Sequence, residues 1–272
     1  MQIDNKELSK IEVLKLTYQK PLEWFRNFRC FIGSIVIVFT LILILAITIF
    51  TLTLPNVEET SFKQLKEIAK QKVISRLSDK KNYYKWTKIA TVNRDYLYTI
   101  VMAEDSNFFT HTGINYDAIV DAMAHNYKSD SYSYGASTIT QQVAKNLYLS
   151  NNKSFIRKLQ EFVITKRLEK KFSKNQILEI YFNLAEFGPD IYGIRAASYK
   201  IFNKNPKDIN AAEGAFISLL LPSPRRYYYS IVQNHNITKK QKRKIKRVLN
   251  DMRFMEYISH QQYKKYLKYK YF

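Results

Sequence analysis

Two carboxylates at the end of an apolar run are the first candidates for chemistry in this sequence. Glu104 and Asp105 directly follow Thr99–Ala103, whose side chains favour burial. A half-buried carboxylate has a raised pKa, and this suits a general base or a general acid. The alternative is that Glu104 or Asp105 caps a helix and that His111 is a structural histidine. The residues alone leave both interpretations open.

A second polar segment, Gly135–Asn146, reads Gly-Ala-Ser-Thr-Ile-Thr-Gln-Gln-Val-Ala-Lys-Asn. Ser137 or Thr138 would cap a helix that starts near residue 138. The first helical turn would then offer hydroxyls, amides and free backbone N–H groups, with Lys145 two turns further on. Such a surface suits sugar hydroxyls and phosphate oxygens. A polar helix start without a ligand is the alternative.

A third segment, Arg157–Glu161, places a carboxylate four residues after an arginine on an expected helix. This spacing is typical of an exposed ion pair that stabilises a helix by about 0.2–0.5 kcal/mol. We expect Leu159, Phe162 and Val163 to face inward on that helix. A fourth polar cluster, Asn183–Gly188, lies where a later helix is expected to end.

The elements that must position these residues are predicted to be helices almost throughout. The chain has only 6 Gly and 6 Pro in 272 residues, and no strand-rich region or repeat is evident. Tyr96–Ala103 is expected to lead into a buried helix end, and Lys128–Tyr134 is expected to be a loop. Apolar spacings of three and four residues predict further helices. Their expected ranges are Ser61–Arg76, Asn115–Tyr127, Thr138–Leu149, Phe155–Lys171, Lys174–Leu184, Ile191–Phe202, Ala211–Leu221 and Asn236–Met255.

The segment Cys30–Leu54 contains 25 residues and no charge. As a helix it would be roughly 37 Å long, enough to cross a hydrocarbon core of about 30 Å. No Ala-x-Ala pattern follows it, so we expect an uncleaved anchor rather than a signal peptide. Arg26 and Arg29 next to the span favour a cytoplasmic N-terminus, with the rest of the chain outside.

The net charge of +21 favours an anionic partner. Residues 1–29 hold six basic and four acidic side chains, which leaves 38 basic and 19 acidic side chains for residues 55–272. Lipid headgroups, a phosphorylated substrate and nucleic acid all fit this balance, although a location outside the cytoplasm disfavours nucleic acid. The basic run Lys239–Arg247 is interpreted as the solvated face of an amphipathic helix. A single cysteine, Cys30, excludes an internal disulfide and a four-thiolate zinc site.

Five blocks between Trp86 and Pro224 match a known family. They are Glu104-Asp-x-x-Phe108-x-x-His111-x-Gly113, the segment Gly135–Asn146, Arg157-Lys158-x-x-Glu161, Ile177-Leu-Glu179-x-Tyr181-x-Asn183 with Phe187-Gly188, and Ala211–Pro224. In this order they resemble the peptidoglycan glycosyltransferase domain of class A penicillin-binding proteins and of monofunctional biosynthetic peptidoglycan transglycosylases. The sequences at residues 135–138 and 185–188 most resemble those of the monofunctional transglycosylases of Gram-negative bacteria.

The resemblance implies an all-α, lysozyme-like glycosyltransferase domain after a single N-terminal transmembrane helix. The expected organisation is a cytoplasmic segment 1–29, the span 30–54, a membrane-proximal helical segment 55–85 and the catalytic domain 86–272. The implied reaction polymerises lipid II into β-1,4-linked glycan strands with inversion, and it releases undecaprenyl diphosphate.

The resemblance also implies roles for individual residues. Glu104 would be the general base that deprotonates the 4-hydroxyl of the acceptor's GlcNAc, and Glu161 the second catalytic glutamate, on the leaving-group side or orienting the donor. Lys145, Lys153 and Arg157 would neutralise the pyrophosphate, although related proteins often carry Arg where this chain has Lys153. The other implied substrate-binding residues are Asp105, Phe108, His111, Ser137, Thr140, Gln141, Gln142, Asn146, Lys158, Asn183 and Gly188.

The resemblance implies no required cofactor and is compatible with a divalent cation, Mg²⁺ or Mn²⁺. The expected partners are lipid II, the growing glycan strand, membrane lipid and cell wall synthesis proteins, with no nucleic acid. The expected location is the inner membrane, with a single span and the catalytic domain in the periplasm. Two alternatives stay open: a lysozyme-like hydrolase (a muramidase or lytic transglycosylase), and a membrane-tethered binding or scaffold protein with a degenerate site.

Overall fold

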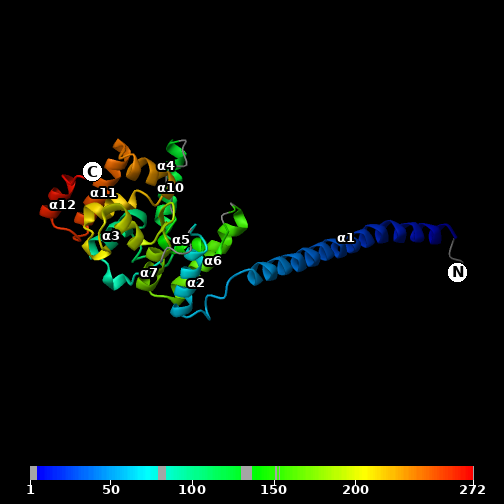
Figure 1. Ribbon diagram of the computed structural model, residues 1–272. Coiled ribbons are helices and arrows are strands. Elements are labelled where there is room, and N and C mark those ends of the chain that lie inside the picture. The colour runs from blue at the N-terminus through cyan, green and yellow to red at the C-terminus, as the bar shows by residue number, and fades with distance from the viewer. Residues whose placement is uncertain (1–4, 79–83, 130–136, 151, 153, 272) are drawn as a thin grey trace. The chain divides into compact units, whose positions relative to one another are not determined.

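The computed structural model describes residues 5–78, 84–129, 137–150, 152 and 154–271 (Figure 1). The chain divides into two compact units, Met1–Leu54 and Pro55–Phe272. Lys153 and most of the expected loop Lys128–Tyr134 lie outside the described residues.

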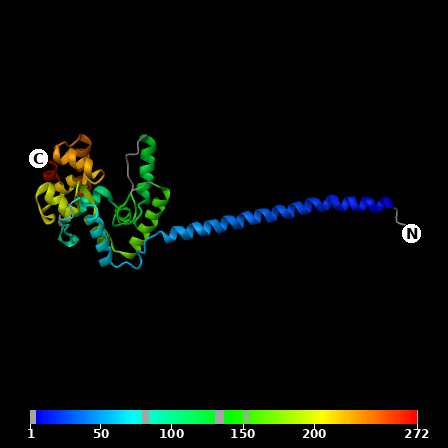
Figure 2. The ribbon, with the colours of Figure 1, turned by 45° about the vertical axis from the view of Figure 1, so that its right-hand side comes forward.

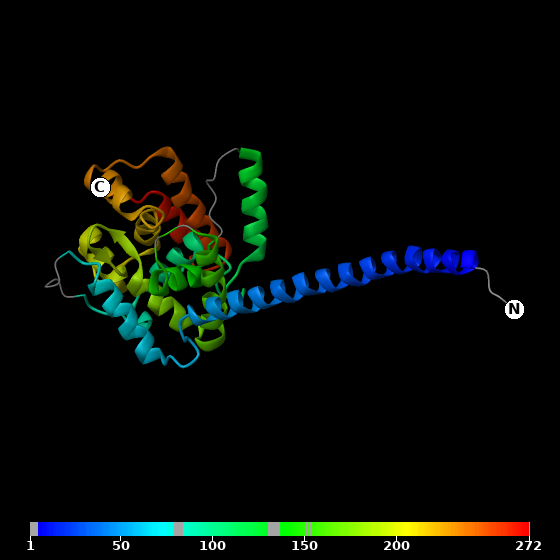
Figure 3. The same ribbon diagram turned by 90° about the vertical axis from the view of Figure 1, so that its right-hand side faces the viewer.

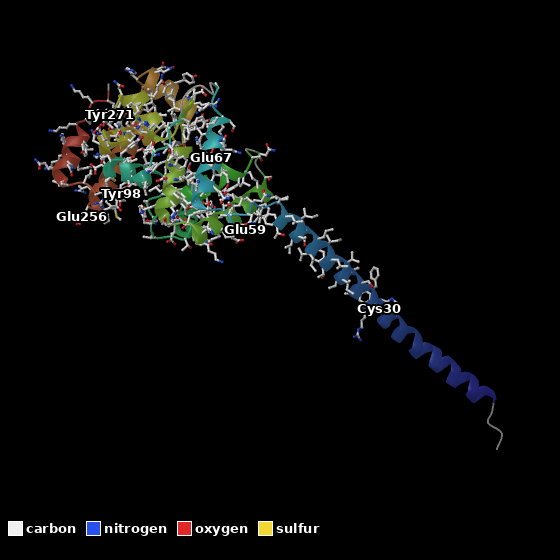
Figure 4. All side chains as sticks on the ribbon, turned by 60° about the horizontal axis from the view of Figure 1, so that its bottom comes forward. Cys30, Glu59, Glu67, Tyr98, Glu256 and Tyr271 are labelled. Carbon is white, nitrogen blue, oxygen red and sulfur yellow. The ribbon has the colours of Figure 1, made fainter. Side chains whose placement is uncertain are left out.

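The first unit is one long helix, α1 (Asn5–Leu52). Its segment Phe28–Leu52 has a mean hydropathy of 3.1 and buries no side chain, so it is long and apolar enough to cross a membrane. Figure 4 shows the side chains of this segment projecting on all sides, with Cys30 labelled. Its few hydroxyls bond to the helix's own backbone, as when Thr40 Oγ1 donates to the Val36 carbonyl at 2.7 Å. This is the arrangement that a hydrocarbon environment requires.

The span differs slightly from the predicted Cys30–Leu54, because the helix ends at Leu52. Thr53 and Leu54 form a turn before Pro55, which disfavours helical geometry in the residue that precedes it. The helix also begins well before the span, at Asn5.

The second unit is almost entirely helical, which confirms the predicted fold class. Its α-helices are α2 (Phe62–Ile74), α3 (Arg94–Glu104), α4 (Tyr116–Ser129), α5 (Ile139–Tyr148), α6 (Phe155–Lys171), α7 (Lys174–Leu184), α8 (Ile194–Phe202), α9 (Ala211–Ser218), α10 (Pro224–Tyr227), α11 (Lys239–Phe254) and α12 (His260–Leu267). Shorter turns are the 3-10 helices η1 (Ile89–Thr91) and η2 (Pro206–Asp208) and the π-helix η3 (Tyr228–Gln233). A small antiparallel hairpin joins β1 (Glu186–Gly188) to β2 (Ile191–Tyr192).

Serine caps fix two helices at their predicted bounds. Ser154 Oγ accepts from the Arg157 backbone N–H at 3.1 Å and starts α6 at Phe155. Ser173 and Gln176 form a reciprocal capping box at the start of α7. Such caps satisfy N–H groups that the first helical turn leaves free, so the sequence alone indicates where these helices begin.

The predicted helix Ile191–Phe202 is wrong in its first three residues. Ile191 and Tyr192 form β2, and α8 begins at Ile194, after Gly193. Gly193 has φ +83°, and a Cβ there would lie 3.3 Å from the Asn183 carbonyl oxygen. The left-handed geometry and the close approach to α7 therefore interrupt the helix.

The core forms where α3 packs on α9, with α11 packed against both helices. A Cβ on Gly214 of α9 would lie 3.1 Å from the Tyr96 ring of α3, so glycine permits this close packing. Helices α5, α6 and α7 pack on one another. Figures 1 and 2 show α11 and α12 (orange to red) on one side of this unit and α4 and α6 (green) on another. Figure 3 shows α4 standing beside the body of the unit.

Candidate active site

Three helices meet at the carboxylate of Glu104. Glu104 is the last residue of α3, and its side chain is 12% exposed. Gln142 Nε2 of α5 donates to Glu104 Oε2 at 3.1 Å. Lys244 Nζ of α11 lies 3.7 Å from Glu104 Oε1. The structure therefore brings together Glu104 and Gln142, as predicted, and adds a lysine from the C-terminal part of the chain.

The surroundings of Glu104 change its acidity in the direction that the sequence indicated. Burial raises the pKa of Glu104 above the usual glutamate value, while the charge of Lys244 and the hydrogen bond from Gln142 oppose part of that rise. Burial also lowers the pKa of Lys244. A carboxylate whose pKa moves toward neutrality is a stronger base than an exposed one.

Asp105 and His111 lock the end of α3 to the start of α5. His111 Nε2 lies 2.9 and 3.0 Å from the two Asp105 carboxylate oxygens, and the Gly113 N–H donates to His111 Nδ1 at 3.0 Å. The latter bond makes Nδ1 an acceptor, so Nε2 carries the proton. The Ile139 N–H donates to Asp105 Oδ2 at 2.9 Å. These contacts support the structural alternative for His111, and they use Asp105 for positioning rather than for substrate.

At the start of α5, several of the predicted binding residues form hydrogen bonds within the domain. Thr138, rather than Ser137, is the N-cap, and its Oγ1 accepts from the Gln141 N–H at 3.2 Å. The Gln141 side chain is buried and accepts in return from the Thr138 N–H at 2.9 Å. Thr140 is buried and donates to Glu169 Oε1 at 2.5 Å. Ser137 is exposed beside this turn.

Further along α5, Lys145 is exposed and takes part in none of the salt bridges of the described residues. The backbone carbonyl of the next residue, Asn146, accepts from Arg76 Nη2 at 2.8 Å. Lys145 is thus available to bind an anion. The bond from Arg76 instead joins the backbone at Asn146 to the residues that follow α2.

Glu161 on α6 is a buried charge, not one member of an exposed ion pair. Its side chain is 3% exposed, Arg157 Nη1 lies 2.9 Å from its Oε2, and Lys158 Nζ bonds to its Oε1. Arg157 Nε is buried and has no hydrogen-bond partner among the described residues. Two cations therefore gather at this carboxylate, and one of them, Arg157, keeps a buried Nε–H without an acceptor among the described residues.

The inward face of α6 differs from the predicted one. Leu159 and Phe162 were expected to face inward but are 43% and 40% exposed. The buried residues of α6 are Glu161, Ile164, Thr165 and Leu168. The spacing of apolar residues predicted an apolar face on α6, but this face is exposed. The buried face instead carries polar side chains of the candidate site, such as Glu161 and Thr165.

The face of α6 that holds Glu161 is turned toward α5. Glu161, Thr165 and Glu169 share one face of the helix at spacings of four residues. Glu169 bonds to Thr140 of α5. A Cβ on Gly113, which has φ +89°, would lie 2.8 Å from Thr165 Cγ2. α5 therefore contacts Glu104 through Gln142, and it contacts the α6 face that carries Glu161 through Thr140.

Three other predicted binding residues belong to the packing of the domain. Asn183 is buried, where its Oδ1 accepts from the Thr87 N–H at 2.7 Å and its Nδ2 donates to the Thr87 carbonyl at 2.8 Å. A Cβ on Gly188 would lie 2.8 Å from the Tyr228 ring. Phe108 is fully buried. The side chains of Asn183 and Phe108 are therefore used within the fold, and Gly188 allows the close approach of the Tyr228 ring.

Lys244 is the site residue that the sequence interpretation missed, because the run Lys239–Arg247 was assigned to solvent. The spacing of apolar residues in this segment did indicate that Lys244 could lie near the protein interior. Lys244 precedes the buried Ile245 and lies four residues before the buried Val248, so it stands at the edge of the apolar stripe. Lys242 and Lys246 on the same helix are exposed.

In the described part of the chain, no group of three or more His, Cys, Asp or Glu side chains is arranged to hold a metal ion. The groups gathered at the site are carboxylates, an amide and cations. They can take up a proton at Glu104 and attract a polyanion near Arg157 and Lys158.

Comparison with known proteins gives one consistent family. Residues 70–253 match the family model described as Transglycosylase. The chain is similar to proteins named "Biosynthetic peptidoglycan transglycosylase" from several bacteria. The Pasteurella multocida (strain Pm70) protein is 42% identical over 142 residues, 52% of this chain and 57% of that protein. The Acinetobacter baumannii (strain ATCC 17978) protein is 36% identical over 173 residues, 64% of this chain and 76% of that protein. The Bordetella avium (strain 197N) protein is 38% identical over 148 residues, 53% of this chain and 62% of that protein.

Proposed function

Because the chain belongs to the transglycosylase family, we propose that it is a glycosyltransferase that joins sugars into the glycan strands of peptidoglycan. The observation that carries the proposal is the buried Glu104, held by Gln142 and Lys244 where α3, α5 and α11 meet. The relatives named "Biosynthetic peptidoglycan transglycosylase" support this proposal, and such an activity belongs to cell wall synthesis.

In the proposed reaction Glu104 is the general base. It accepts the proton of the 4-hydroxyl of the acceptor's GlcNAc, and that oxygen attacks C1 of the donor's MurNAc. The bond between C1 and the phosphate oxygen breaks, and undecaprenyl diphosphate leaves with the bonding electrons. Attack from the face opposite to the leaving group gives inversion and a β-1,4 link. The raised pKa of Glu104 supports this role, because a carboxylate with a raised pKa takes up a hydroxyl proton more readily.

Arg157 and Lys158 are proposed to stabilise the leaving diphosphate. They flank the buried Glu161, and Arg157 Nε still has a free N–H among the described residues. Negative charge grows on the diphosphate as the bond to C1 breaks, so cations held in place lower the barrier selectively. Both carboxylate oxygens of Glu161 are bonded to these cations, which favours a role in orienting them. Lys145 and Lys153 are proposed to add further positive charge.

The proposed location is the inner membrane, with the second unit in the periplasm. The apolar span Phe28–Leu52 supports an anchor. The outer side of α6 also supports contact with lipid, because Phe155, Ile156, Leu159 and Phe162 are all exposed there. The proposed partners are lipid II, the growing strand, membrane lipid and cell wall synthesis proteins, with no nucleic acid. No cofactor is proposed to be required, although a divalent cation such as Mg²⁺ or Mn²⁺ would suit the diphosphate of the substrate.

The test is to incubate the full-length protein with lipid II in one reaction and with pre-formed glycan strands in another. We expect long strands from lipid II and no shortening of the pre-formed strands. Cleavage of the pre-formed strands without synthesis would indicate a lysozyme-like hydrolase. Binding of lipid II without either reaction would indicate a scaffold protein. Repeating the synthesis with a chelator present tests whether a divalent cation contributes.

A further inference from the structure

A hollow of about 500 Å³ lies beside α8 and the β1–β2 hairpin. None of its described lining residues belongs to the group around Glu104 and Glu161. It is bordered by three tyrosines and three cations: Tyr84, Lys85, Tyr192, Arg195, Tyr199 and Lys200.

Hydrogen bonds hold the walls of this hollow in place. The Tyr84 hydroxyl donates to the Asn183 carbonyl of α7 at 2.7 Å. The guanidinium of Arg195 lies 4.9 Å from the centre of the Tyr199 ring, and the Tyr199 hydroxyl accepts from Asn205 Nδ2 at 3.1 Å. A preformed wall loses little conformational entropy when it binds a ligand.

The charge of the described lining is positive, and no salt bridge among the described residues neutralises its cations. The salt bridges of the described residues include neither Lys85, nor Arg195, nor Lys200. The one carboxylate in the described lining is Asp190, which accepts from the Ser78 N–H at 2.8 Å. This contact is the main reason why the pKa of Asp190 is lowered, so Asp190 is ionised at neutral pH. Three cations and one anion leave an excess of positive charge for a ligand.

The size and the aromatic walls restrict the kind of anion. Sites for small ligands commonly measure about 300–1,000 Å³, so this hollow is large for a single inorganic ion. Tyrosine rings offer flat apolar faces together with hydroxyls, and such faces suit peptide and sugar groups. Lysine and arginine bind carboxylates through charge-assisted hydrogen bonds.

We propose that this hollow binds the carboxylate-bearing stem peptide of the glycan strand, as a second contact apart from the reacting groups. The inference rests on the proposed function, because that function brings a strand with peptide stems to the enzyme. The structure offers cations for the peptide carboxylate and tyrosine rings for the peptide body.

The test measures binding of a fluorescent N-acetylmuramoyl pentapeptide to the full-length protein in detergent. A second probe has its carboxylates capped as amides. We expect the acid probe to bind about tenfold more tightly than the amide probe, because the amide loses charge-assisted bonds. The double variant Arg195→Gln/Lys200→Gln is expected to lose this preference. The control Lys170→Gln/Lys171→Gln removes the same charge from exposed positions on α6 and should bind as the unchanged protein does.

Equal binding of the two probes would overturn the proposal, as would an unchanged preference in the Arg195/Lys200 variant. Displacement of the acid probe by equimolar inorganic phosphate would also overturn it, because the site would then accept any anion. If the first double variant does not fold, Lys85→Gln/Lys200→Gln replaces it, since both lysines are exposed. Strand synthesis from lipid II is measured separately. A protein that makes no strand but distinguishes the two probes would contradict the proposed function. It would still support the proposal that the hollow binds the stem peptide.

Discussion

At the scale of single residues, the proposed chemistry depends on how Glu104 is held. Its carboxylate lies between an amide donor on α5 and an ammonium group on α11. Burial raises its pKa and the cation lowers it, so the balance between the two decides how much of the carboxylate is ionised at a given pH. Lys244 is therefore a positioning and tuning residue in this account.

Substitution Lys244→Met should move the pH profile of strand synthesis. A general base works only when it is deprotonated, so activity rises as pH passes through the pKa of Glu104. Lys244 lowers that pKa, and its loss should shift the rising limb of the profile toward higher pH. The rate at each pH gives the profile.

The matched control for this shift is Lys242→Met, an exposed lysine on the same helix. It should leave the rising limb in place. A Lys244→Met profile that falls equally at every pH would indicate a structural role and contradict the tuning role.

Glu161 provides a second prediction at this scale. Replacement by Gln removes the charge that holds Arg157 and Lys158, so both cations become free to move. We expect the rate of strand synthesis to fall by about tenfold or more, with a smaller change in lipid II binding, because the cations act mainly on the leaving group. Steady-state kinetics separate the two effects. A change confined to binding would place Glu161 in substrate recognition instead.

At the scale of elements, the loop between α3 and α4 packs closely against α6. Gly113 in this loop has φ +89°, and a Cβ there would lie 2.7 Å from Glu169 Cγ and 2.8 Å from Thr165 Cγ2. No other residue type adopts this geometry against α6 without strain.

Gly113→Ala should therefore destabilise the second unit by about 2 kcal/mol and reduce strand synthesis. Thermal unfolding followed by circular dichroism measures the first effect. Gly33→Ala is the control, because no atom lies within 4 Å of a Cβ at that position of α1. An unchanged melting temperature for Gly113→Ala would mean that the loop does not hold α6 in place.

The elements that could be predicted from sequence are those with local signals. Ser154 and Ser173 begin α6 and α7 through side-chain caps, and such caps depend on a few neighbouring residues. The β1–β2 hairpin escaped prediction because Asp190 and Gly193 take left-handed angles that are set by contacts with the rest of the domain.

The sequence predicted which residues are candidates for the site, but it did not predict which of them are used in internal contacts. Glu104 and Gln142 meet as expected. The side chains of Asp105 and Asn183 instead form hydrogen bonds with backbone groups that are distant in sequence, those of Ile139 and Thr87. Lys244 reaches the site from a helix far along the chain. Contacts between segments that are distant in sequence are invisible to local patterns, and this is why these roles were missed.

At the scale of the whole molecule, a strongly basic domain and an apolar span occur in one chain. The second unit carries 38 basic and 19 acidic side chains, since six and four of the chain's total lie before the span. A positive field attracts anionic lipids and their diphosphates, and in the proposed function a membrane tether would keep the enzyme in the same plane as its lipid-linked substrate.

Removal of residues 1–54 should lower strand synthesis in lipid bilayers and leave it nearly unchanged in detergent. The reason is that the tether raises the local concentration of membrane-held substrate without touching the reacting groups. Rates in vesicles and in micelles, measured with the same lipid II, test this. Equal turnover of the truncated and full-length proteins in bilayers would contradict the tethering argument.

The most direct test of the central claim is strand synthesis by Glu104→Gln, compared with Glu67→Gln, which alters an exposed glutamate on α2 (Figure 4). The amide keeps the shape of the side chain but cannot take up a proton. We predict that Glu104→Gln folds, binds lipid II and makes no strand above about one thousandth of the normal rate, in line with the usual contribution of general bases. Glu67→Gln should polymerise normally. Substantial strand synthesis by Glu104→Gln would contradict the account.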